Sequence, residues 1–212
     1  MSAVDPPQPP KRPWFEPATI ILMGAATLAT AWSSFESSRW DAKSRDSMEL
    51  AVKLDRRSLA LQIDSRQIKG VHFNILSELI DAKFSGDKKR YDFYLNRLGD
   101  ELKPAFEKWM ADHPFETPGL SSHPLMDDYY QPRHQDEIES TRIGAEKAES
   151  QSRMAGGNAG AHLANTVILS AVLLFAGTAR TFDQRKVRTT VFAFAVVLFL
   201  FSVTRMILLP IA

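Results

Sequence analysis

Apolar and charged residues occupy separate parts of this chain. Charged residues crowd the stretch from 36 to 153. The stretches without Asp, Glu, Lys or Arg are residues 18–35, 163–179 and 189–204. A membrane-spanning helix needs about 20 mainly apolar residues, because each residue advances only about 1.5 Å. We therefore predict transmembrane helices at residues 17–35, 161–179 and 189–209.

The first apolar stretch could also belong to a cleaved signal, since Lys11 and Arg12 precede it and small residues follow at 29–31. A retained anchor fits better, because the helical pattern continues past Ala31 without a turn. Aromatic residues typical of membrane interfaces mark its ends at Trp14, Trp32 and Trp40. Residues 1–16 are rich in proline and are predicted to form a disordered tail.

No proline interrupts residues 18–84, so we predict that the first helix continues beyond the membrane as a stalk. A bend, if present, is expected at the serines of residues 33–38. Apolar residues of the stalk recur at spacings of four and seven, which places them on one helical stripe that needs a packing partner. This stripe consists of Leu50, Leu54, Leu61, Ile68, Ile75 and Leu79.

Further helices are predicted after the stalk. A turn signal at 85–87 precedes a helix that begins near residue 88 and that Pro104 should kink or divide. A proline-rich connector at 112–132 and a long helix from about residue 134 lead back to the second span. Helical spacing predicts a packed core, rather than a ligand cleft, for Tyr91, Tyr94, Leu95, Leu98, Leu102, Phe106, Trp109 and Met110.

The predicted fold class is an all-α membrane protein, with three transmembrane helices and a helical-hairpin extramembrane domain at residues 36–160. A basic loop at 180–188 joins the last two spans. Before the second span, the small residues Gly156 and Gly160 favour either close helix packing or flexibility near the membrane interface.

Positive charges set the predicted orientation, since Lys and Arg in short loops tend to stay cytoplasmic. The basic loop holds Arg180, Arg185, Lys186 and Arg188. With this loop inside, we predict a multi-pass inner-membrane protein whose N-terminus is cytoplasmic and whose helical domain is periplasmic. The alternative, a cytoplasmic domain, is favoured by Arg39, Lys43, Arg45 and Arg153.

Composition narrows the function classes. A formal net charge of +1 gives no argument for a nucleic-acid partner. The absence of cysteine excludes disulfides and thiolate metal sites. The sequence has no Walker loop, dinucleotide-binding glycine pattern, nucleophile elbow or EF-hand loop. We therefore assign no catalytic, cofactor-binding or metal-binding residue from the sequence.

Two short patterns still suggest chemistry. The pair Arg66 and His72 resembles the Arg-x4-6-His pair of HEPN ribonucleases, in which these residues polarise the RNA phosphate and transfer protons. Both residue types are also common on polar helix faces. Near the connector, imidazole and carboxylate groups could hold a divalent metal if the loop converged, the alternative being turns with solvated histidines. These groups belong to His113, His123, Asp127, Asp128, His134 and Asp136.

Glu36 and Arg205 are the ionisable residues closest to the predicted membrane core, where burying a charge is costly. Both lie near the outer ends of their spans, so we expect Arg205 to snorkel and Glu36 to stay hydrated. A role in conduction, or an ion pair between the two side chains, is the alternative.

The stretch KPAFEKWMADHPFETP, residues 103–118, resembles a signature of uncharacterised small bacterial membrane proteins. In that family a Pro-Ala-Phe-x-x-Trp run lies between membrane spans. The resemblance implies the same architecture and a bacterial origin, and it implies no activity.

The leading functional hypothesis is a non-enzymatic assembly, scaffold or sensor component. Its predicted partners are the lipid bilayer and either its own copies or another membrane protein. A second hypothesis is a subunit of an oligomeric ion channel or a transport accessory, although hydroxyls in membrane helices also bond helix carbonyls. Its pore-facing groups would be Thr19, Thr27, Thr30, Asn165, Thr166 and Ser170. The third hypothesis is an RNA-cleaving or metal-dependent membrane enzyme.

Overall fold

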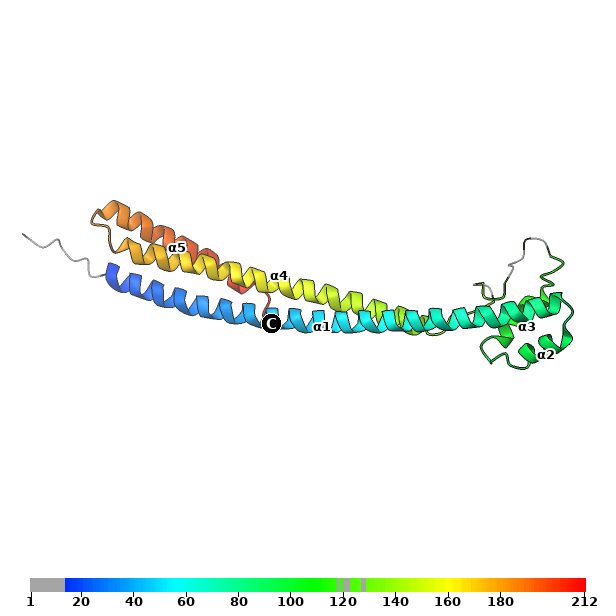
Figure 1. Ribbon diagram of the computed structural model, residues 1–212. Helices are drawn as coiled ribbons and strands as arrows, with labels where there is room; N and C mark the ends of the chain where they lie inside the picture. Colours follow the sequence, from blue (N-terminus) through cyan, green and yellow to red (C-terminus); the bar gives the residue numbers. More distant parts are fainter. Residues whose placement is uncertain (1–13, 118, 120–122, 127–128) are drawn as a thin grey trace, which may run out of the picture. The chain divides into compact units, whose positions relative to one another are not determined.

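The computed structural model describes residues 14–117, 119, 123–126 and 129–212. These residues form five helices and no strand, which confirms the all-α class (Figure 1). The helices are α1 (Phe15–Phe84), α2 (Lys88–Leu95), α3 (Lys103–Ala111), α4 (Gln135–Ala179) and α5 (Arg185–Leu208). Helices α1, α4 and α5 are each long and apolar enough to cross a membrane, as the three apolar stretches predict. Of the predicted N-terminal tail, residues 1–13 lie outside the described part of the chain.

Helix α1 runs without a break for 70 residues, as the absence of proline predicts. The serines at 33–38 do not interrupt it. The helix ends where the turn signal predicts, since Gly86 adopts a positive φ of 73° that glycine tolerates without steric cost. Asp87 then caps α2 by accepting a hydrogen bond from the backbone N–H of Arg90.

The helix predicted from residue 88 is divided in two, as Pro104 suggests. The division itself lies earlier, in the turns at 96–102, and Pro104 occupies the first turn of α3. Proline is well tolerated there because the first helical N–H groups have no partner within the helix. Pro104 therefore starts the second helix instead of breaking a longer one.

The chain forms two compact units, which divide within α1 and within α4. Unit 1 comprises Met1–Glu49 and Ala148–Ala212, and unit 2 comprises Leu50–Lys147.

Unit 2 has an aromatic core that gathers α2, α3, the end of α1 and part of the connector. Its buried members are Leu76, Leu79, Leu98, Leu102, Ala105, Phe106, Trp109, Leu125 and Tyr130. Tyr91, Tyr94, Leu95 and Met110 pack against them. All eight residues that helical spacing assigns to a core are thus in it, and a packed core is confirmed in place of a ligand cleft.

Farther along α1 in unit 2, the buried face differs from the predicted stripe. Leu79 is buried, but Leu50 is 49% exposed. The buried positions are instead the small residues Ala51, Ser58 and Ser65, which recur every seven residues. The reason is close helix packing: a Cβ added to Gly144 of α4 would lie 3.2 Å from Cδ1 of Leu54, so large side chains are pushed to the edges of the contact.

In unit 1, α1 and α4 approach closely enough for side chains to reach the opposite backbone. Ser44 Oγ donates to the carbonyl of Ser152 at 2.9 Å, and Ser152 Oγ donates to the carbonyl of Ser44 at 2.8 Å. A Cβ on Gly156 would lie 3.3 Å from Ser44 Oγ, whereas Gly160 faces open space. Of the two alternatives, close packing therefore holds for Gly156, whereas no neighbouring group approaches Gly160.

The outer surface of unit 1 is apolar. Inside it, Leu22, Ala26, Val172, Ala176 and Ala195 form one buried apolar cluster, with flanking half-buried residues. Many large apolar side chains of α1, α4 and α5 point outward and are more than half exposed, among them Ile21, Leu28, Val167, Leu174, Val197 and Ile207. A water-soluble protein rarely exposes so large an apolar surface.

Candidate functional site

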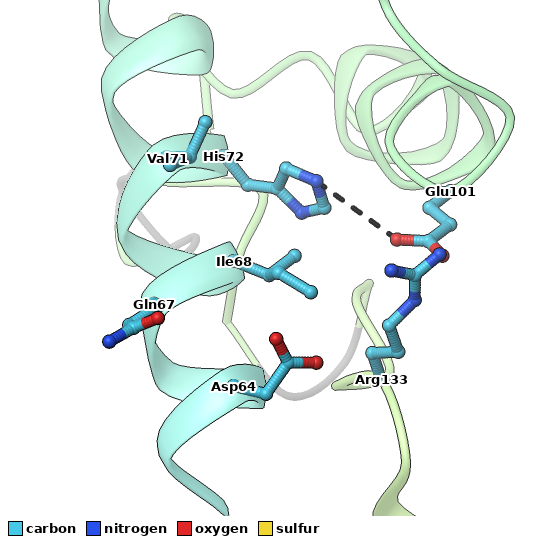
Figure 2. A pocket seen from close by; sticks show the side chains of 7 residues that line it. All are labelled: Asp64, Gln67, Ile68, Val71, His72, Glu101 and Arg133. Carbon is cyan, nitrogen blue, oxygen red and sulfur yellow. Dashed lines mark ion pairs between the residues drawn. The ribbon is translucent and has the colours of Figure 1, made fainter. Parts of the chain in front are cut away.

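An open cleft of about 420 Å³ lies in unit 2 between one face of α1 and two turns. The α1 side chains stand three or four residues apart, and a helix places such residues on one face. Figure 2 shows His72, Ile68 and Asp64 facing Glu101 and Arg133 across the cleft. The complete lining is Asp64, Gln67, Ile68, Val71, His72, Glu101 and Arg133.

His72 contacts one residue of the buried core and one residue of the cleft. Its Nδ1 lies 3.1 Å from the hydroxyl of Tyr130, and its Nε2 lies 4.0 Å from Oε2 of Glu101. Glu101 also pairs with Arg133 at 2.9 Å. Burial lowers the pKa of His72 from its ordinary value of 6.5, and Arg133 lowers it further, while Glu101 opposes both effects. The ring is therefore kept neutral near pH 7.

A second set of charges lies beside the cleft, where α4 begins. His134 adopts a positive φ of 64°, and its Nε2 lies 3.3 Å from Oδ2 of Asp64. Its Nδ1 lies 3.6 Å from Glu137, which also accepts hydrogen bonds from Arg57 of α1. The bond from Arg57 is the main cause that lowers the pKa of Glu137. These contacts join the start of α4 to α1 within unit 2.

The cleft does not assemble the ribonuclease-like pair. Arg66 is exposed and is not part of the lining. Six residues of helix correspond to a rotation of about 240°, so Arg66 and His72 point in different directions. Both acidic groups of the cleft are already paired with basic ones.

The candidate metal ligands near the connector lie in separate environments. His123 stacks on Phe73 with ring centroids 4.5 Å apart, whereas His134 pairs with Asp64. Asp127 and Asp128 lie outside the described residues. Within residues 14–117, 119, 123–126 and 129–212, no three His, Cys, Asp or Glu side chains are grouped to hold a metal ion.

A polar cluster lies inside unit 1, among otherwise apolar helices. Asn165 of α4 donates to Ser33 Oγ of α1 at 3.1 Å and accepts from Ser202 Oγ of α5 at 2.7 Å. All three residues are fully buried. This network links the three helices, since each one contributes a member.

Glu36 belongs to the same buried region, which corrects the expectation that it stays hydrated. The residue is 0% exposed within the chain. Its carboxylate pairs with Arg39 at 3.3 Å and accepts the backbone N–H of Ala212 at 2.8 Å. Its ionic partner is thus Arg39 and not Arg205. The prediction failed because the chain after α5 folds back over Glu36, which hydropathy cannot reveal.

The hydroxyls considered as pore-lining groups bond their own helices. Thr19, Thr27 and Thr30 each donate to the carbonyl four residues earlier. Thr166 and Ser170 do the same. These bonds give a structural role to every member of that set except Asn165, which bonds across helices.

His162 was missed at the level of sequence. It is 1% exposed, and its Nε2 lies 3.0 Å from the carbonyl of Pro210. A usable signal was present, because His162 and Asn165 stand three residues apart in an apolar stretch without other ionisable groups. Polar residues at that spacing share a helix face, which in a membrane helix points to protein rather than lipid.

No family model, curated protein or solved structure matches this chain. The resemblance of residues 103–118 to a family of small bacterial membrane proteins therefore stays a prediction.

Proposed function

We propose that this protein is a non-enzymatic, membrane-anchored assembly, scaffold or sensor component. Unit 1 is the anchor, in which α1, α4 and α5 cross the inner membrane. Unit 2 is a helical-hairpin domain outside the membrane that binds a second copy of the chain.

The apolar exterior of unit 1 supports membrane insertion. Side chains such as Leu28, Val167 and Val197 are between 62% and 74% exposed in the single chain. In hydrocarbon these exposed apolar side chains avoid contact with water. The buried side chains of Asn165 and Ser202 hydrogen-bond each other inside the bundle, as polar groups in a membrane must. The basic loop at 180–188 supports a cytoplasmic location for that end of the bundle and a periplasmic unit 2.

The hairpin is supported by contacts between α1 and α4 within unit 2. Arg57 pairs with Glu137, and Leu54 lies against Gly144, so residue numbers fall along one helix as they rise along the other. This antiparallel pair is closed at its far end by the aromatic core around Trp109.

An exposed apolar row on α1 carries the proposal that unit 2 binds a partner. Val52, Leu59 and Ile63 are 37%, 50% and 56% exposed. Their spacings of seven and four place them on one helix face, away from the face that packs small residues against α4. We call these three residues the outer row. Asp55 and Arg56 are exposed between Val52 and Leu59 on the same side of α1, so charged groups separate the first two members of the row.

A second copy of the chain is the occupant that fits the outer row. Copies anchored in one bilayer hold their outer rows at equal height and with parallel helices. The interval of seven from Val52 to Leu59 is the repeat of a coiled coil, and the shared membrane makes the two helices parallel. Confinement to one membrane also raises the effective concentration, so that a short row of contacts suffices.

Disulfide trapping tests this arrangement, because the chain has no cysteine of its own. Leu59→Cys should give covalent dimers in membranes under mild oxidation. Ala60→Cys is the matched control, since it is also exposed but stands on a different face of α1. Detergent-corrected light scattering should give an oligomer for the native chain and a monomer for the double variant Leu59→Glu, Ile63→Glu. Equal trapping at 59 and 60, with a monomeric native chain, would contradict the proposal.

The channel or transport hypothesis is favoured by one observation, which is that unit 1 contains polar groups in a mainly apolar bundle. Glu36, His162 and Asn165 are enclosed within a single chain and do not line an open surface. Ion flux in reconstituted vesicles, lost in Asn165→Leu, is the result that would favour transport over assembly.

A further inference from the structure

The basic loop, residues 180–188, joins α4 to α5 and includes the first turn of α5. Figure 1 shows that α1 begins at the same end of unit 1. Arg180, Arg185 and Lys186 are exposed, and Arg188 is partly buried. Asp183 is the only acidic residue of the loop, so positive charge predominates there.

The charges of the basic loop are not neutralised by acidic side chains of the described chain. Asp183 and Glu16 are the carboxylates of this end of unit 1, since Glu16 lies in the first turn of α1. Within residues 14–117, 119, 123–126 and 129–212, neither of them pairs with a basic side chain, and none of the four basic residues of the loop forms an ion pair.

Other arginines of unit 1 have their countercharges within the chain. Arg39 pairs with Glu36 at 3.3 Å, and Arg45 pairs with Asp41 at 3.2 Å. On α4, Arg153 pairs with Glu149 at 3.0 Å. An external anion would therefore meet neutralised arginines at these positions, but positive charges without an ionic partner in the described residues at the basic loop.

Arg188 is held in place by an aromatic contact between α1 and α5. Its Cζ lies 4.8 Å from the ring centre of Phe15, and this ring packs against Phe192 with centroids 5.3 Å apart. A guanidinium presents paired N–H donors that match two oxygens of a phosphate group. Arg185 stands three residues earlier on α5, and a helix places residues at that spacing on one face. Two guanidinium groups can therefore reach one phosphate.

Apolar side chains beside the basic loop indicate which kind of anion fits. Trp14, Phe182 and Val187 are 51%, 40% and 37% exposed. A small soluble anion gains nothing from such neighbours, whereas a phospholipid carries a phosphate and acyl chains in one molecule. Tryptophan together with long basic side chains is typical of the depth at which lipid headgroups lie.

We propose that the basic loop binds anionic phospholipids, with Arg185 and Arg188 at the headgroup phosphate and the neighbouring apolar side chains beside the acyl chains. Basic residues next to a membrane-spanning helix attract anionic lipids. This inference rests on the proposed membrane anchor, and it adds a preference among the lipids that surround the anchor.

Lipid titration of the purified full chain in mild detergent tests the proposal, with bound lipids counted by native mass spectrometry. The probes are phosphatidylglycerol and phosphatidylcholine with identical acyl chains, which differ in net headgroup charge. Each basic residue near anionic lipid strengthens binding about fivefold, so phosphatidylglycerol should bind on the order of tenfold more tightly. Equal affinity of the native chain for the two lipids would overturn the proposal without any variant.

Two double variants remove the same number of charges from unit 1. Arg185→Gln, Arg188→Gln should reduce the difference between the two lipids to within about twofold. Arg45→Gln, Arg153→Gln is the matched control, because these exposed arginines are already paired, and it should keep the native preference. An equal loss in both variants would mean that net charge, and not the basic loop, selects the lipid.

Soluble anions and the membrane anchor are tested separately. Displacement of phosphatidylglycerol by millimolar inorganic phosphate would assign the basic loop to a free anion and contradict the lipid proposal. Flotation with phosphatidylcholine vesicles tests the anchor itself. A chain that does not float contradicts the proposed function, whereas a chain that floats but does not prefer phosphatidylglycerol contradicts only the inference about the basic loop.

Discussion

Unit 1 and unit 2 are built from the same two long helices, yet they place polar and apolar groups in opposite ways. In unit 2, Trp109 and Phe106 are buried, while charged residues such as Arg57 and Glu137 are exposed. In unit 1, Glu36 is fully buried, whereas leucines and valines of all three helices are exposed.

This contrast is the one expected if lipid surrounds unit 1 and water surrounds unit 2. An apolar core lowers the free energy of unit 2 in water, because burial removes apolar surface from water. Unit 1 gains little from burying leucine if lipid surrounds it, so close backbone contact and hydrogen bonds hold its helices together. The following variants separate these two modes of stabilisation.

The largest effect is expected for Trp109→Ala in unit 2. Trp109 is 2% exposed, and removal of such a side chain typically costs about 3–5 kcal/mol through lost burial and the cavity left behind. Hydrogen exchange should lose protection in α2 and α3 but not in α5. Phe84→Ala is the control, since Phe84 is 76% exposed and should cost less than about 1 kcal/mol. Equal loss of protection in α5 would contradict separate stabilisation of the two units.

The next largest effect is expected for Asn165→Leu in unit 1. The substitution leaves the hydroxyls of Ser33 and Ser202 without their buried partner, which should cost about 1–2 kcal/mol. The cost can be measured as a change in the free energy of unfolding in detergent. Asn158→Leu, also on α4 but outside the network, should be near neutral. If adding an apolar side chain at 165 stabilised unit 1, hydrogen bonding would not be what holds it together.

Alanine substitution at two glycines of α4 should change the stability of unit 1 by a smaller amount, and the result should differ between the two positions. Gly160→Ala should stabilise unit 1 by about 0.5–1 kcal/mol, because alanine favours the helix and the new Cβ meets open space. Gly156→Ala should gain less or become destabilising, since its Cβ would lie 3.3 Å from Ser44 Oγ. Unfolding in detergent gives both values. Equal gains would mean that α1 and α4 do not pack closely there.

The smallest effect should come from pH on unit 2. Burial lowers the pKa of His72 and of His123 below their ordinary value of 6.5. As pH falls below about 6.5, the unfolded chain therefore binds protons first, and the stability of unit 2 should decrease until the folded chain is protonated as well.

Urea unfolding measures this dependence in the triple variant Trp14→Phe, Trp32→Phe, Trp40→Phe. Trp109 is then the only tryptophan, so its fluorescence reports on unit 2. The double variant His72→Gln, His123→Gln should show a flatter dependence between pH 7 and pH 5. A stability that rises on acidification would contradict the direction of both pKa shifts.

The sequence predicted the helices well because local signals determine them. The turn at Gly86 ends α1, and spacing alone placed all of Tyr91, Phe106 and Trp109 in one core. The candidate sites were predicted less well. The cleft around His72 also needs Glu101 and Arg133, which no local pattern connects to α1.

By itself, the sequence determined that the chain is helical, where three helices are apolar enough to span a membrane, and which aromatic residues form a core. Those features depend on the order of residues within about one helix. Tertiary structure decided that Ala51 and Ser58 face α4, that Glu36 is buried and that His162 meets Pro210. These outcomes depend on how closely two helices approach and on groups distant in sequence, and neither is encoded in local hydrophobic spacing.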